Sequence, residues 1–129
     1  MASELRVTTI ANNAGTESVN TTYVINGSAK AWLNIDTTSF TIRDNLNNSS
    51  ATDVGSGLAT FNVTSAMNND DFAFAISRNG NTGTSNNLVI EQTAQTTSSI
   101  SVSTKFMYTG SINLGDATTA CATLFGDLA

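Results

Sequence analysis

The chain has no histidine and only one cysteine, Cys121, among its 129 residues. Histidine is the usual general base and transition-metal ligand near neutral pH, and an isolated thiol has no base beside it to activate it. A hydrolytic triad therefore cannot be assembled, and we expect neither an enzyme nor a bound cofactor. Between Ala120 and Ala122, Cys121 is expected to be a small buried core residue. A single cysteine also excludes an intrachain disulfide, so stability must come from sheet hydrogen bonds and from contacts with other subunits.

Charged side chains are scarce, at 12% of the residues, and the formal net charge is −5. The basic residues are isolated from one another: Arg6, Lys30, Arg43, Arg78 and Lys105. Without a basic patch to neutralise phosphates, binding to nucleic acid or to an anionic membrane is disfavoured. The first ten residues have no apolar run long enough for a signal peptide, and no segment approaches a membrane span. We expect synthesis in a cytoplasm without targeting, and no membrane insertion.

The acidic residues form no catalytic or metal-binding pattern. Asp70 and Asp71 are adjacent, so in an extended segment their side chains would point to opposite faces and could not act as an acid-base pair. We interpret this segment as a solvated turn. Oxygen atoms of Asp36, Asp44, Asp53 or Asp70 could form a calcium site in a loop, but the ligand spacing of an EF-hand loop is missing. We therefore expect no bound metal.

The abundant residues favour a folded protein with an uncharged polar surface. Asn, Ser and Thr number 16, 15 and 21, together 52 of the 129 residues. The apolar residues occur in short alternating runs rich in Val, Ile and Phe, separated by frequent turn signals, as is typical of an all-β protein. A chain of this length encloses one core. We therefore predict an antiparallel β-sandwich or jelly-roll-like fold, a single domain over residues 1–129 without a helix.

The strongest local turn signal is Asn26-Gly27, because both residues tolerate positive φ angles. It predicts a β-hairpin with strands Val19–Ile25 and Ser28–Ile35. Before it, Leu5–Ile10 is expected to form the first strand. Further strands are predicted at Phe40–Arg43, Ser49–Val54, Leu58–Thr64, Ile100–Tyr108 and Ala120–Phe125, with a turn at Gly55-Ser56-Gly57 and an exposed loop at Asn79–Asn87.

The segment Phe72–Ile76 shows strand alternation most clearly. Phe72, Phe74 and Ile76 share one face, and Ala73 and Ala75 share the other. We predict that the Phe face belongs to the core, together with Leu33, Ile35, Phe61 and Val63. The two alanines are candidates for a subunit contact, because small side chains let another backbone approach closely.

Trp32 lies on the same strand face as Lys30 and Asn34, opposite the apolar Leu33 and Ile35. Three interpretations remain open for it. Trp32 could be buried in a strand covered on both faces, or anchor a subunit interface, where tryptophan is enriched. It could also serve as a platform on which a sugar stacks.

The segment from Asn26 to Asp44, with its run Asn26-Gly27-Ser28-Ala29-Lys30-Ala31-Trp32, resembles a module that recurs in short fibre and appendage proteins on tailed bacteriophage particles. The other segments that carry this resemblance are Met1–Val7, Ser49–Gly57, Phe61–Val63, Ala66–Met67 and Ala122–Gly126. The resemblance covers most of the chain and is thin only between about Ser77 and Ser98.

This resemblance implies a structural protein of a virion, made in the host cytoplasm and assembled as an oligomer, with a preference for a homotrimer. The candidate residues for the subunit interface are Trp32, Ala73, Ala75, Leu5 and Val7, and residues 1–25 are a candidate segment for assembly or anchoring. A tail fibre or similar appendage would bind other phage structural proteins and a glycan on the host surface. The alternatives are a capsid decoration protein that stabilises the phage head and a carbohydrate-binding module.

Overall fold

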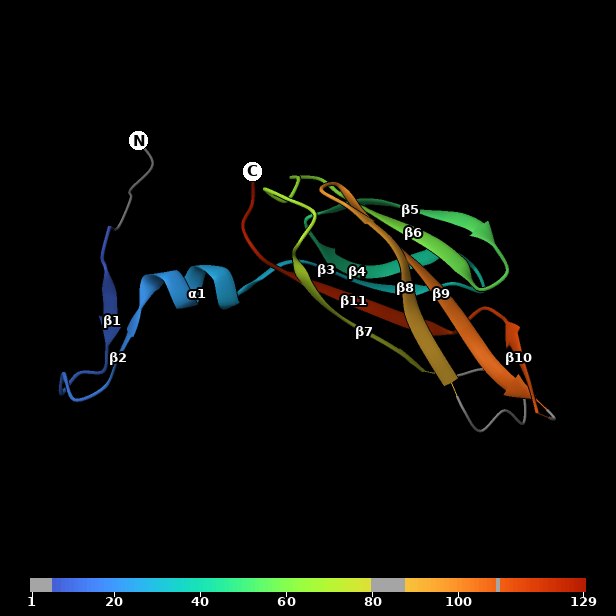
Figure 1. The fold of residues 1–129 in the computed structure, drawn as a ribbon, viewed down its shortest axis with the longest axis horizontal. Helices are drawn as coiled ribbons and strands as arrows, with labels where there is room; N and C mark the ends of the chain where they lie inside the picture. The colour runs from blue at the N-terminus through green and yellow to red at the C-terminus, as the bar shows by residue number, and fades with distance from the viewer. Residues whose placement is uncertain (1–5, 80–87, 109) are drawn as a thin grey trace.

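A computed structural model of the chain describes residues 6–79, 88–108 and 110–129. Two antiparallel sheets pack face to face as a sandwich, and an N-terminal segment of residues 6–27 extends from one end of it (Figure 1). The predicted all-β, antiparallel sandwich is thereby confirmed.

The first sheet has four strands in the order β4-β3-β11-β7. Its strands are β3 (Ala29–Asp36), β4 (Thr41–Leu46), β7 (Ala73–Asn79) and β11 (Thr119–Phe125). In β3, Ala31, Leu33 and Ile35 are buried, and the residues between them face outward. Strand β11 was predicted correctly, and it lies between β3 and β7.

The second sheet is built around the long strand β9. It contains β5 (Asn48–Gly55), β6 (Leu58–Val63), β8 (Leu88–Thr96), β9 (Ser99–Tyr108) and β10 (Ser111–Leu114). Strand β8 pairs along the length of β9, whereas β6 pairs with its first half and β10 with its second half. The predicted hairpin across Gly55-Ser56-Gly57 is confirmed, and Gly57 adopts a φ of 69° in its turn.

One residue, Asn47, carries the chain from the first sheet to the second between β4 and β5. Its φ is 53°, a left-handed conformation that asparagine tolerates better than most residues. The Asn47 side chain accepts a hydrogen bond from Ser65 N at 2.8 Å and donates one to Ser65 O at 3.1 Å. These bonds fix the corner at which the two sheets meet.

The core lies between the sheets and contains every residue that alternation assigned to it. Of the predicted core residues, Leu33, Ile35, Phe61, Val63 and Phe72 are buried in this cluster. Phe74 and Ile76 are partly buried and pack against it.

The prediction of a buried thiol at Cys121 needs correction. It is only half-buried, because its neighbours Ala120 and Ala122 are the residues that point inward from β11.

The hairpin predicted at Asn26-Gly27 is wrong, because a helix ends at this position. Residues 6–27, which we call the arm, contain a short hairpin of β1 (Thr9–Ala11) and β2 (Ser18–Asn20), followed by helix α1 (Thr21–Gly27). Asn20 begins the helix, and its side-chain oxygen accepts a hydrogen bond from Thr22 N at 2.8 Å. This cap satisfies a backbone donor that would otherwise be unpaired, so a helix forms where a strand was expected.

Two further strand predictions need correction. Phe40 is not part of β4, because it adopts a φ of 52° in the preceding turn, and the strand begins at Thr41. The first strand begins at Thr9 and not at Leu5, which lies outside the described residues. The loop predicted at Asn79–Asn87 also lies outside them, except for Asn79, which ends β7.

Candidate assembly surface

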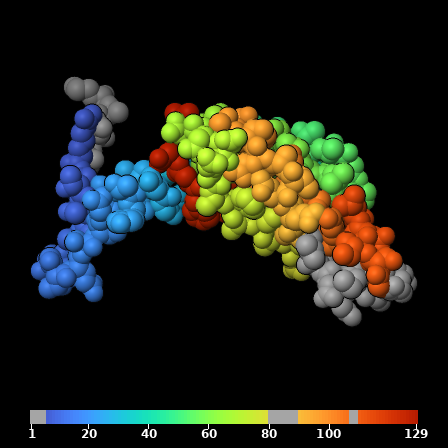
Figure 2. All heavy atoms as spheres, viewed as in Figure 1, coloured from blue at the N-terminus to red at the C-terminus, as the bar shows by residue number. Residues whose placement is uncertain are grey.

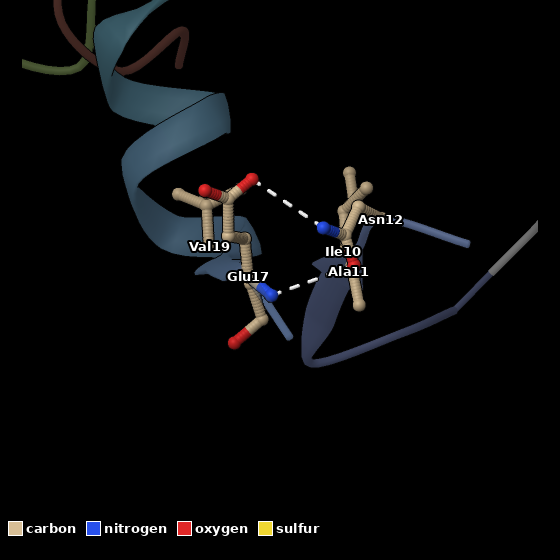
Figure 3. Close-up of a pocket in the computed structure, with 6 residues that line it drawn as sticks. Ile10, Ala11, Asn12, Glu17 and Val19 are labelled. Carbon is tan, nitrogen blue, oxygen red and sulfur yellow. Dashed lines mark hydrogen bonds between the residues drawn. The ribbon is translucent and has the colours of Figure 1, made fainter. Parts of the chain in front are cut away.

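The hairpin of the arm presents an apolar pair that no part of the described chain covers. Ile10 of β1 lies opposite Val19 of β2, and their side chains are 49% and 39% exposed. Next to this pair on the hairpin, Asn12 N donates to Glu17 O at 2.9 Å. The Asn12 side-chain amide donates to the Glu17 carboxylate at 3.4 Å, and its oxygen accepts a hydrogen bond from Glu17 N at 3.4 Å (Figure 3). Together these residues line an open hollow of about 370 Å³.

Thr21, the first residue of helix α1, makes hydrogen bonds to the segment before β1. The Thr21 hydroxyl donates to the carbonyl oxygens of Val7 at 3.0 Å and Thr8 at 3.1 Å. The helix has no buried residue, and Tyr23 is 75% exposed. An amphipathic helix of a globular protein normally buries its apolar side, and short helices gain most of their stability from such packing. Helix α1 therefore lacks the packing partner that would stabilise it.

The arm joins the sandwich through hydrogen bonds at the end of α1. Ser28 N donates to Val24 O at 3.1 Å, and the Ser28 hydroxyl donates to Ile25 O at 3.0 Å. The Lys30 ammonium donates to Ile25 O and to the Ser28 hydroxyl. A cation at this end of a helix also interacts favourably with the helix dipole. Figure 2 shows the arm standing out from one end of the sandwich.

The arm holds a large share of the exposed apolar surface of the described chain. Among the eleven exposed large hydrophobic residues, six lie in the arm: Val7, Ile10, Val19, Tyr23, Val24 and Ile25. All residues from Arg6 to Asn20 and from Thr22 to Gly27 are exposed, so none of these side chains is buried in the described chain. A concentration of exposed apolar side chains of this kind marks an interaction site.

A second candidate surface lies on the outer face of the first sheet. Thr123 of β11 pairs with Trp32 of β3 on one side and with Ala75 of β7 on the other, so these three residues form a row across the sheet. Trp32 is half-buried and Ala75 exposed. In the next row, the side-chain oxygen of Asn34 is buried and accepts no hydrogen bond. This face therefore presents one aromatic side chain, and beneath it lies an acceptor that has no donor within the described chain.

The predicted interface residues thus fall on two separate surfaces. Trp32, Ala73 and Ala75 share the outer face of the first sheet, as alternation predicted, whereas Val7 lies in the arm and is 44% exposed. Leu5 lies outside the described residues. Trp32 is only partly buried in the described chain, less than the full burial that one of the three interpretations expected.

The sequence interpretation missed four arm residues, Val19, Tyr23, Val24 and Ile25. It placed them in a strand of the sandwich, where alternate side chains would have been buried. The signal that could have found them is the asparagine at position 20, a strong helix N-cap residue, before a run with apolar side chains on both strand faces.

The charged residues of the sandwich serve local hydrogen bonding. A hydrogen bond from the Thr38 hydroxyl, backbone hydrogen bonds and the Arg43 guanidinium 2.9 Å away hold the pKa of Asp36 below its usual value of 3.8. Hydrogen bonds from Lys105 and Ser103 likewise lower the pKa of Glu91 below 4.5.

Across the described residues, no group of three or more His, Cys, Asp or Glu could hold a metal ion. Asp70 and Asp71 are both exposed.

A hollow of about 260 Å³ lies on the second sheet, between the β5-β6 hairpin and β8. Its lining is mostly apolar, with Val54, Leu58 and Ala94 beside the hydroxyls of Thr60 and Ser101. Those two hydroxyls bond to each other at 2.8 Å. None of the described lining residues is aromatic, so this hollow has no platform for stacking a sugar.

No family model, curated protein or solved structure matches the chain. The fold and the arm therefore define the class: an all-β sandwich with an N-terminal arm whose apolar side chains are uncovered. In the part of the chain that is described, no helix is long and apolar enough to span a membrane.

Proposed function

We propose that the protein is a non-enzymatic structural subunit of a bacteriophage particle, in a tail fibre or similar appendage. The arm attaches the chain to the particle assembly, and the sandwich is displayed outward. The observation that carries the proposal is the arm itself, which places six large apolar side chains in solvent at one end of a domain that has a complete core elsewhere.

Such an arm is energetically unfavourable in a free monomer. Exposed apolar surface costs free energy in water, and the three-residue strands β1 and β2 are too short to be stable as an isolated hairpin. An arm that is covered in an assembly avoids both problems. The resemblance of the segment Asn26–Asp44 to modules of phage fibre proteins supplies the kind of assembly, and the preference for a homotrimer.

The shape of the molecule agrees with a polarised subunit. The arm leaves one end of the sandwich, and β10 lies at the other end (Figure 1). If the arm faces the particle, the β10 end faces outward, where contact with other phage proteins or with a glycan on the host would take place. A capsid decoration protein is the same class of structural subunit and would use the same arm.

Co-sedimentation with particles tests this proposal. Particles of a phage whose genome encodes the chain are purified on a density gradient, digested with a protease and analysed by mass spectrometry. We expect the chain to remain with intact particles at a constant number of copies after a high-salt wash. Recovery of the chain only in the soluble fraction would reject a structural role.

A further inference from the structure

We infer that the arm of one copy packs against the arms of other copies of this chain, and not against a sandwich. This inference rests on the proposed assembly role of the arm and names its partner. Four properties of the arm support it: apolar surface, size, charge and free strand edges.

The apolar side chains of the arm are distributed over both of its parts. Ile10 and Val19 form one uncovered pair on the hairpin, and Tyr23 and Ile25 are 75% and 55% exposed on the helix. Aromatic side chains are enriched in interfaces between proteins, and burial of large aliphatic side chains removes apolar surface from water. Such side chains lie on both the hairpin and the helix of the arm. Each of two identical arms can therefore place its apolar side chains against the other arm and cover the apolar surface of that arm.

The size of the arm fits one side of a stable interface. A standard interface involves about 20–30 residues from each partner. The arm, residues 6–27, reaches this number by itself, and every residue in it except Thr21 is exposed. The number of residues in an arm is therefore compatible with an interface made between arms.

Charge distinguishes an arm from a sandwich as the partner. Residues 1–27 have one basic residue, Arg6, and two acidic residues, Glu4 and Glu17, a net charge of −1. Residues 28–129 have four basic and eight acidic side chains, a net charge of −4. An arm in contact with a sandwich would lie against the more acidic part of the chain, whereas contact between arms keeps the acidic sandwiches apart.

Backbone pairing can extend the contact. Strands β1 and β2 pair only with each other, so each keeps a free edge in the described chain. A free strand edge presents unpaired N–H and C=O groups that pair readily with a strand from another molecule. Arms placed side by side can satisfy these groups in one another.

Sedimentation velocity of the purified full-length protein tests the inference. We expect the wild-type chain at micromolar concentration to sediment as an oligomer with a mass that is a multiple of 13.4 kDa. Two double variants remove the apolar anchors: Ile10→Ser with Val19→Ser on the hairpin, and Tyr23→Ser with Ile25→Ser on the helix. Each should raise the dissociation constant at least about a hundredfold, because loss of an interface anchor commonly costs that much affinity.

A matched control uses the other end of the molecule. Ile112→Ser with Leu114→Ser removes two side chains of β10 that are 65% and 43% exposed, and we expect it to leave the oligomer intact. Circular dichroism checks that each variant keeps the β-sheet spectrum of the sandwich. Because the substituted residues are exposed in the single chain, the sandwich itself should remain folded.

Three results would overturn the inference. One is a monomeric wild-type chain, and another is arm variants that sediment like the wild type. The third is dissociation caused by Trp32→Ala and not by the arm variants, which would move the interface to the outer face of the first sheet. These results concern the purified protein alone, so they differ from a failure of the proposed function, which would appear as absence of the chain from particles.

Discussion

Replacing Thr37 by valine should destabilise the sandwich although the two side chains have nearly the same volume. Thr37 follows β3 and is 5% exposed, and Ala117, before β11, is fully buried. The Thr37 hydroxyl accepts a hydrogen bond from Ala117 N at 2.7 Å and donates to Ala117 O at 3.1 Å, and Thr37 N also donates to Ala117 O at 2.9 Å. Valine keeps the backbone bond but leaves Ala117 N without an acceptor.

The expected cost follows from that one buried donor. An unsatisfied buried polar group costs about 1–3 kcal/mol, and the isosteric change adds little for a cavity. The loss corresponds to a fall in Tm of about 4–8 °C per kcal/mol for a domain near 100 residues.

Urea unfolding followed by the fluorescence of Trp32 measures this cost. The substitution is made in the Ile10→Ser, Val19→Ser chain, so that loss of association does not contribute to the midpoint. Thr93→Val, at an exposed position of β8, is the control and should change the free energy of unfolding by less than about 0.5 kcal/mol. Equal stabilities for the Thr37 and Thr93 variants would refute the reasoning.

Three further predictions concern the sandwich. Phe61→Ala should cost about 3–5 kcal/mol in urea unfolding, and Phe74→Ala less, because Phe61 is 1% exposed and Phe74 only partly buried. Because its partners lower the pKa of Glu91 in the folded state, this carboxylate stabilises the fold above pH 4.5, and the stability is lost as the pH falls through the lowered value. Glu91→Gln should therefore flatten the acid limb of a stability-pH curve, and an unchanged limb would exclude this role. Gly57→Ala should lower the Tm, because a Cβ there would lie 2.4 Å from Gly115 N at a φ of 69°; an unchanged melting curve would show that the turn relaxes.

The sandwich could be predicted from the sequence because alternation and turn residues agree along most of it. Leu33 and Ile35 face inward and Trp32 outward, as a period of two requires. Gly55 and Gly57 flank the turn of the β5-β6 hairpin at the predicted place. In these segments the local preference of the chain and the packing of the core favour the same structure.

The arm could not be predicted because its local signals conflict. Val24 and Ile25 favour a strand, and Asn26-Gly27 favours a hairpin turn, but Asn20 caps a helix and Gly27 does not adopt a positive φ. No core contact decides between these preferences, since the arm has no buried residue. The candidate surface was therefore only half predicted: Val7 and the outer-face residues were named, and Tyr23 and Ile25 were not.

A reconstruction of the intact particle by electron cryomicroscopy tests the central claim most directly. The account predicts copies of the sandwich on the outside of the particle, with their arms gathered at the attachment point and their β10 ends outward. A particle without density for this sandwich, or with arms that point into solvent, would contradict it.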